Sequence, residues 1–160
     1  MIKNEKAIRI LTAILVICII ATIAFIFSNS AKSVEESSEQ STSLYVEVKP
    51  VIDPVIVPVV GEEGLTHNLF RKMAHFAEFF ALGFFVSALL FVRNQKSKKW
   101  VLCSLIFGFI TATADETLQI FTSRGAGVKD VFIDFFGYST AFFGVLFVWW
   151  ILNKIMCKGR

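Results

Sequence analysis

The hydrophobic residues of this chain are gathered into four long runs, separated by two short polar segments and one long one. The runs cover residues 10–27, 73–92, 100–121 and 131–152, and each is 18–22 residues long. A helix needs about 20 apolar residues to cross the ~30 Å hydrocarbon layer of a bilayer. The pattern predicts an all-α integral membrane bundle of four transmembrane helices, with residues 1–160 in a single domain.

Composition narrows the class of protein further. Hydrophobic residues make up 55% of the chain, the mean hydropathy is +0.66 and 18 residues are phenylalanine, which leaves too little polar surface for a water-soluble domain. The formal net charge of +3 is too small and too scattered for nucleic-acid binding. Cys18, Cys103 and Cys157 lie in or beside apolar runs without a CxxC spacing, so we expect packing residues rather than disulfides.

Basic residues flank the runs unevenly and predict the orientation of the bundle. Ten of the sixteen Lys and Arg residues lie in the N-terminal segment, between the second and third runs and in the C-terminal tail. They are Lys3, Lys6, Arg9, Arg93, Lys96, Lys98, Lys99, Lys154, Lys158 and Arg160. Because short basic segments stay in the cytoplasm, both termini are predicted to be cytoplasmic and residues 28–71 extracytoplasmic. The first run exceeds the roughly 7–15 apolar residues of a signal peptide, so we expect a retained span.

The segment 28–71 is the only long connection between runs. Its serine-rich first part is polar and is expected to be flexible. Prolines at positions 50, 54 and 58 remove backbone donors and oppose a regular helix in its second part. That part is too apolar for water, so we expect it to lie along the membrane surface or across the helix ends. Thr66 is predicted to cap the second spanning helix.

Polar side chains interrupt the runs near their outer ends. A charge near the bilayer centre costs ~2.5–3.5 kcal/mol on insertion scales, so such positions carry information. Arg71, His75 and Glu78 are spaced i, i+4, i+7 and share one helix face. Further polar residues near the outer ends are Asp115, Glu116 and Gln119 in the third run and Asp130 and Asp134 at the start of the fourth. At ~1.5 Å per residue the acids within the runs lie roughly 5–10 Å below the outer ends, which predicts one polar layer.

Several of these residues also have simpler explanations that the sequence leaves open. Asp130 suits a helix cap, Lys72 suits snorkelling to headgroups and Gln119 suits packing between helices. An ion-pair network alone would account for the layer, although buried ion pairs contribute little net stability. In the fourth run Gly137 and Gly144 predict the close approach of a neighbouring helix.

Three motifs of this layer follow one another in the last three runs. They are Arg71-Lys-Met-Ala-His-Phe-Ala-Glu78, Asp115-Glu-Thr-Leu-Gln-Ile-Phe-Thr-Ser-Arg124 and Asp130-Val-Phe-Ile-Asp-Phe-Phe-Gly137. This order resembles the VanZ-like family, whose pattern reads R-K-x-x-H-F-x-E, D-E-x-x-Q-x-F-x-x-x-R and D-[VI]-x-x-N-x-x-G. The family usually has Asn where this chain has Asp134, and Pro-Gly where it has Thr122 and Ser123.

The resemblance implies a multi-pass protein of the bacterial cell membrane. The family is named for an accessory membrane protein of teicoplanin resistance, so it also implies a role in tolerance of glycopeptide antibiotics. It implies no particular reaction, and the mechanism has to be argued from the residues.

The first functional hypothesis is an enzyme that acts on an envelope lipid or a lipid-linked glycan. His75 would be the general base, because an imidazole exchanges protons near neutrality, and Asp115 or Glu116 would orient it or act as the acid. The hypothetical catalytic residues are His75, Glu78, Asp115 and Glu116. The residues expected to bind the ligand, with cationic groups for phosphate, are Arg71, Lys72, Gln119, Arg124, Asp130 and Asp134.

The alternative is a non-catalytic membrane protein that captures a lipid, a lipoglycopeptide antibiotic or a wall-synthesis partner at the same layer. A third interpretation uses His75, Glu78 and either Asp115 or Glu116 as ligands of a divalent metal, which the spacing His-x-x-Glu allows without requiring it. The sequence assigns no metal or cofactor and does not decide whether the chain is an enzyme. The lipid bilayer is the one partner that it requires.

Overall fold

The computed structural model describes residues 4–61, 63–95, 97–123, 125 and 127–158, apart from the side chains of residues 60 and 156–158. It contains the helices α1 (Glu5–Ser30), α2 (Val34–Val60), α3 (His67–Val92), α4 (Lys98–Phe121) and α5 (Val128–Lys158). Across these described ranges every regular element is a helix. Four of them, α1, α3, α4 and α5, are long and apolar enough to cross a bilayer. The prediction of an all-α protein with four spans is confirmed, and the chain is a multi-pass membrane protein.

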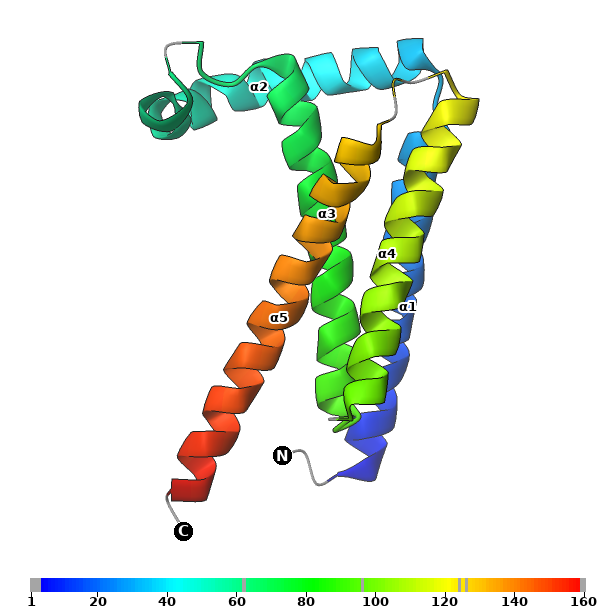
Figure 1. The fold of residues 1–160 in the computed structure, drawn as a ribbon, viewed down its shortest axis with the longest axis vertical. Helices are drawn as coiled ribbons and strands as arrows, with labels where there is room; N and C mark the ends of the chain where they lie inside the picture. The colour runs from blue at the N-terminus through cyan, green and yellow to red at the C-terminus, as the bar shows by residue number, and fades with distance from the viewer. Residues whose placement is uncertain (1–3, 62, 96, 124, 126, 159–160) are drawn as a thin grey trace.

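The four spanning helices run side by side, with both chain termini at the same end of the bundle (Figure 1). The connection between α3 and α4 lies at that end too, whereas α2 and the connection between α4 and α5 lie at the other. The basic flanking segments therefore share one end, which is the arrangement that the topology prediction requires. That this end faces the cytoplasm stays a prediction.

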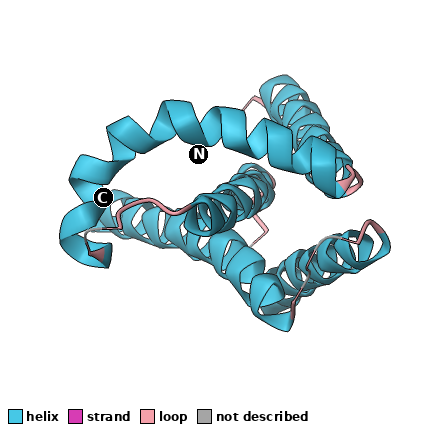
Figure 2. Ribbon diagram, turned by 90° about the horizontal axis from the view of Figure 1, so that it is seen from above, coloured by secondary structure: helices cyan, strands magenta, loops and turns pink. Residues whose placement is uncertain are grey.

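Helix α2 corrects the expectation for the long connection, because neither a flexible first part nor an irregular second part is observed. Ser33 begins the helix with a capping box, in which its side chain accepts from the Glu36 N–H while the Glu36 side chain accepts from the Ser33 N–H. The helix then runs through Pro50, Pro54 and Pro58. Their spacing of four places the missing backbone hydrogen bonds along one side, so the helix bends instead of ending. Figure 2 shows the resulting arc.

Helix α2 lies across the ends of the spanning helices opposite the termini (Figure 1), which we call the outer ends after the predicted topology, and it is held at Leu65. The Tyr45 hydroxyl donates to the Leu65 carbonyl over 2.8 Å, and the Leu65 N–H donates to Asp53 Oδ1 over 2.7 Å. Leu65 is itself fully buried. Thr66 then accepts from the Leu69 N–H at 3.2 Å, which confirms the predicted cap of α3.

The closest packing in the bundle is the crossing of α3 and α5, where a glycine on each helix receives the backbone of the other. A Cβ atom on Gly83 would lie 2.1 Å from the Tyr138 carbonyl oxygen. A Cβ atom on Gly137 would lie 2.4 Å from the Phe76 carbonyl oxygen. Side chains larger than hydrogen at these two positions would separate the helices.

Helix α4 joins this crossing through Tyr138, which is fully buried. A Cβ atom on Gly108 would lie 2.5 Å from the Tyr138 ring, and the Tyr138 hydroxyl donates to the Ser104 carbonyl at 2.8 Å. Around this point lies a core cluster that also takes one residue from α1; its members are Ile26, Phe79, Leu82, Val86, Leu90, Ala112, Tyr138 and Phe142. The packing therefore fixes α3, α4 and α5 against one another just inward of the predicted polar layer.

Candidate functional site

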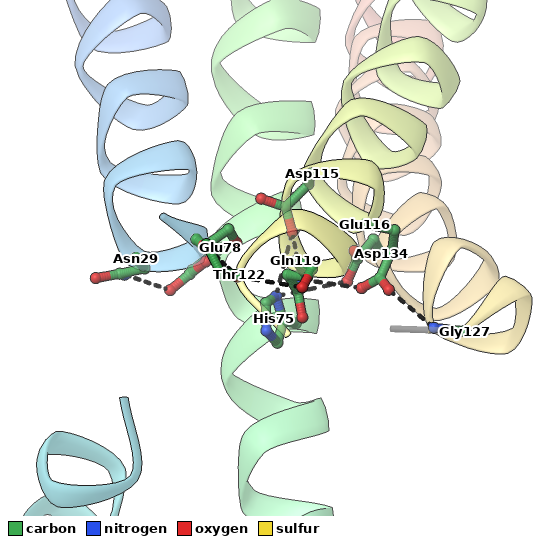
Figure 3. Close-up of polar contacts among 10 residues, drawn as sticks. Asn29, His75, Glu78, Asp115, Glu116, Gln119, Thr122, Gly127 and Asp134 are labelled. Atoms are coloured by element: carbon green, nitrogen blue, oxygen red, sulfur yellow. Dashed lines mark hydrogen bonds and ion pairs between the residues drawn. The ribbon is translucent and has the colours of Figure 1, made fainter. Parts of the chain in front are cut away.

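Three polar side chains from three spanning helices meet at the outer end of the bundle. His75 comes from α3, Asp115 from α4 and Asp134 from α5, and Figure 3 shows them gathered together. The Nδ1 atom of His75 lies 3.8 Å from Asp115 Oδ2 and 4.0 Å from Asp134 Oδ1. The His75 side chain is 18% exposed, whereas those of Asp115 and Asp134 are 0% and 1% exposed.

The helix crossing explains why these three residues meet. Gly137 is pressed against the backbone of Phe76, the neighbour of His75, and Asp134 lies one turn outward from that contact on α5. Gly108 brings α4 against Tyr138 in the same way, and Asp115 lies two turns outward from it. The two glycines thus set how closely the helices that carry the polar residues approach one another.

Gln119 forms hydrogen bonds with both acids of α4 in the polar layer. Its Nε2 group donates to Asp115 Oδ2 at 2.9 Å and to Glu116 Oε1 at 3.0 Å. The other oxygen of Glu116 accepts the Gly127 N–H at 3.1 Å, from the connection that leads into α5. Both oxygens of Glu116 are therefore held by neutral donors, and the side chain is only 5% exposed. Both of these hydrogen bonds from Gln119 lie within α4.

Glu78 contacts α1, and with His75 it lines the cavity where α1, α2 and α3 meet. Its Oε1 atom accepts from Asn29 Nδ2 of α1 at 3.0 Å, as Figure 3 shows. Asn29 Oδ1 in turn accepts from Lys32 Nζ at 2.9 Å. The sequence analysis missed Asn29 and Lys32, and the signal for them is the polar serine-rich exit of the first run.

The predicted cationic residues lie outward from the buried group. Lys72 Nζ forms an ion pair with Asp130 Oδ1 at 3.4 Å, which joins α3 to the first turn of α5. Because α5 begins at Val128, Asp130 lies within the first turn and is not the cap of the helix, although its carboxylate complements the helix dipole there. Arg71 lies one turn outward from His75 on α3. Arg124 lies outside the described residues.

Small cavities connect these groups to the outer surface. One of about 60 Å³ is lined by Arg71, Lys72, His75, Glu116 and Asp134, among others. A second, of about 110 Å³, lies where α1, α2 and α3 meet, and it shares Arg71 and His75 with the first. His75 therefore faces two cavities, and each of them also contains a guanidinium group that can bind an anion.

The buried acids determine what the site can do chemically. Among the described residues one group of His and acidic side chains has ligand atoms close enough for a metal ion, namely His75, Asp115 and Asp134, within 4.8 Å of one another. This group shares His75 and Asp115 with the set that the sequence suggested, but it has Asp134 in place of Glu78. An imidazole beside carboxylates can also exchange protons with a bound ligand.

Comparison with known proteins gives one positive finding. The family model VanZ/LLP1 matches residues 12–152, which cover the four spanning runs apart from residues 10 and 11, and all three motifs. No curated protein and no solved structure matches the chain.

Proposed function

The chain belongs to the VanZ/LLP1 family, and from that premise we propose that it works in the bacterial cell membrane on an envelope lipid or a lipid-linked glycan. In this proposal it contributes to tolerance of glycopeptide antibiotics such as teicoplanin. The chemistry takes place at the outer polar site, with the headgroup of the lipid as the part that reacts.

One observation carries the proposal, which is that His75 lies between buried acids in a cavity that also contains cationic groups. Its Nδ1 atom is about equally distant from Asp115 and Asp134, at 3.8 and 4.0 Å. Arg71 and Lys72 line the same cavity, and the Lys72 side chain is 39% exposed. Cationic side chains at the surface with an acid and imidazole group beneath them suit an anionic headgroup that enters from the outer leaflet.

The roles of the side chains follow from their burial. Arg71 and Lys72 hold phosphate oxygens, since a guanidinium forms paired hydrogen bonds with such a group. His75, Asp115 and Glu116 form the reactive centre, where protons move to and from the headgroup. Asp134 completes the negative side of that centre.

An apolar groove on the lipid-facing surface supports a lipid as the substrate. It lies between α3 and α5, measures about 460 Å³ and includes Phe80, Thr140, Gly144 and Trp149. Its outer end, at Phe80, is little more than one turn inward from His75 on the same helix. A headgroup in the polar site would leave its hydrocarbon chain beside this groove.

The proposal is tested by antibiotic susceptibility and lipid mass spectrometry on the same cultures. Cells lacking the gene are compared with cells that express the wild type, His75→Ala or Glu116→Ala at equal level. Glu47→Gln is the matched control, because Glu47 is an exposed acid on α2. We expect a teicoplanin shift and an altered lipid species in the wild type and the control, and the loss of both in the two site variants. Normal behaviour of both site variants would contradict the proposal.

A second function, in which the site captures a ligand without a reaction, is favoured because two of the acids are already held by hydrogen bonds. Glu116 and Glu78 already accept hydrogen bonds from Gln119, Gly127 and Asn29. Such acids can hold the shape of a binding site without taking part in a reaction. Capture predicts a susceptibility shift with no change in any lipid, and a marked loss on Arg71→Lys, because the paired hydrogen bonds of the guanidinium would be lost. A covalently altered lipid that depends on Glu116 would exclude capture alone.

A further inference from the structure

We propose that His75, Asp115 and Asp134 bind one divalent cation of the Mn²⁺ or Zn²⁺ class. The inference rests on the proposed function, since it names what occupies the reactive centre of that same site. The cation would lie between α3, α4 and α5, at the inner side of the cavity that contains Arg71 and Lys72.

The strongest observation concerns the burial and the hydrogen bonding of the Asp134 carboxylate. Its side chain is 1% exposed, and neither carboxylate oxygen has a hydrogen-bond donor among the residues that the structure describes. Within the same residues its one ion-pair partner is His75, at 4.0 Å. A buried carboxylate at membrane depth is costly unless a positive charge balances it. One neutral or singly charged imidazole at 4.0 Å balances the Asp134 carboxylate poorly, whereas a divalent cation bound directly to it would balance it well.

The distances between the ligand atoms fit a metal ion. The His75 Nδ1 atom is 3.8 and 4.0 Å from the two aspartate oxygens, and all three ligand atoms lie within 4.8 Å of one another. A point equidistant from three atoms so arranged is roughly 2.5 Å from each. Metal–ligand bonds in proteins are about 2.0–2.6 Å long, so shifts of a few tenths of an ångström suffice for binding.

The neighbouring side chains leave these three residues as the ligands. Glu116 and Glu78 are held by other donors, as described above. One imidazole with two carboxylates suits Mn²⁺ or Zn²⁺ better than Ca²⁺, which takes oxygen ligands only. The remaining coordination positions face the cavity of about 60 Å³, which has room for several water molecules or for one oxygen of a headgroup.

The cation changes the division of roles within the site. His75 becomes a ligand that is held by its Nδ1 atom, and proton transfer falls to Glu116, which lines the same cavity. Asp134 supplies the second carboxylate of the group and is buried without a hydrogen-bond donor among the described residues, so it is the residue on which the cation should depend most.

The test is Mn²⁺ binding to the purified full chain in lipid nanodiscs, after removal of metal with a chelator. Free Mn²⁺ is followed by its electron paramagnetic resonance signal. We expect one strong site in the wild type and a loss of affinity of at least about 10- to 100-fold in Asp134→Asn, the loss that even an outer partner of a ligand causes. Glu47→Gln is the control, because it also removes one carboxylate charge but at an exposed position on α2 outside the site, and it should bind as the wild type does.

Two results would overturn the cation site. One is a folded wild-type chain that binds no Mn²⁺, with folding checked by circular dichroism. The other is equal binding by the wild type, Asp134→Asn and Glu47→Gln, which would place the ion elsewhere. Because binding is measured without lipid substrate, the site and the proposed function fail separately. Site-specific Mn²⁺ binding with no lipid or susceptibility change would sustain the cation site and contradict the function, and the opposite pattern would overturn the cation site alone.

Discussion

The backbone carbonyl oxygen of Phe76 occupies the space that a side chain at Gly137 would need, with only 2.4 Å to an ideal Cβ position. This contact presses α3 against α5 directly beside His75 and one turn inward from Asp134. The distance of 4.0 Å between those two side chains therefore depends on the absence of a side chain at position 137. The packing of the bundle and the geometry of the candidate site are consequences of the same contact.

Replacing Gly137 by alanine should separate these helices. Because the new methyl group would meet backbone rather than a movable side chain, we expect the protein to lose about 1–3 kcal/mol of stability. The measurement is the midpoint of unfolding by heat or by SDS in detergent micelles. Gly144→Ala on the same helix is the control, since a Cβ atom there would meet nothing within 4 Å. Equal midpoints for the two variants would show that the close contact does not limit the packing.

The four spans could be predicted because each depends only on a local run of apolar residues. Helix α2 could not, because the prolines were counted as three separate helix breakers. Pro50, Pro54 and Pro58 are spaced by four, so they share one side of a curved helix. This spacing is visible in the sequence, but it favours a helix only if a helix is already assumed there. The capping box at Ser33 and Glu36 was the local signal that would have favoured the helix.

The sequence predicts which residues form the polar layer, but not which of them contact one another. Glu78 follows His75 by three positions, so both lie on the same broad face of α3. Which neighbour each one meets depends on where α1 and α5 pack, and periodicity carries no information on that. The structure directs Glu78 to Asn29 on α1 and His75 to Asp134 on α5. The roles of these residues in function stay predictions.

Gln119 should matter more than its neutral side chain suggests. It donates to Asp115 and Glu116 at once, so Gln119→Leu would remove a hydrogen bond from each of two buried carboxylates. We expect a loss of about 1–3 kcal/mol of stability, the cost of leaving buried polar groups unsatisfied. The same unfolding midpoint measures it. Thr117→Val is the control, because Thr117 lies on the exposed side of α4 and should shift stability by no more than about 0.5 kcal/mol.

The attachment of α2 to Leu65 should weaken at low pH. The Leu65 N–H, and then Lys49, lower the pKa of Asp53 below its ordinary value of 3.8. A carboxyl whose pKa is lower in the folded state contributes stability above the ordinary value, and this stability is lost as the pH falls through the folded pKa. We therefore expect the Leu65 amide to stay protected from hydrogen exchange down to pH 3.8 and to lose protection below it.

Hydrogen exchange of the peptide that contains Leu65, corrected for the intrinsic rate at each pH, measures this effect. Asp53→Asn should reduce protection at neutral pH as well, because the charged acceptor of the 2.7 Å hydrogen bond is gone. Glu47→Gln changes an exposed acid on the same helix and should leave the profile unchanged. Protection in Asp53→Asn equal to that of the wild type would show that other contacts hold Leu65.

The contact between Asn29 and Glu78 offers a test of how α1 is held at the site. Asn29→Asp would place two carboxylates at the present separation of 3.0 Å between Nδ2 and Oε1. Repulsion and the lost donor should destabilise the protein by about 1–3 kcal/mol. The double variant Asn29→Asp, Glu78→Gln reverses the direction of the hydrogen bond, because the new glutamine amide donates to the new aspartate.

A double-mutant cycle on the unfolding midpoints separates the pair from its surroundings. We expect the double variant to recover most of the stability lost in Asn29→Asp, with a coupling of about 0.5–3 kcal/mol. Lys32, which already donates to the Asn29 side-chain oxygen at 2.9 Å, would favour the new aspartate as well. Additive effects of the two changes would mean that this pair does not hold α1, which would then depend on the apolar core around Ile26 and on the hydrogen bond from Thr122 to the Ser30 carbonyl. In that case Asn29 would have no part in shaping the site.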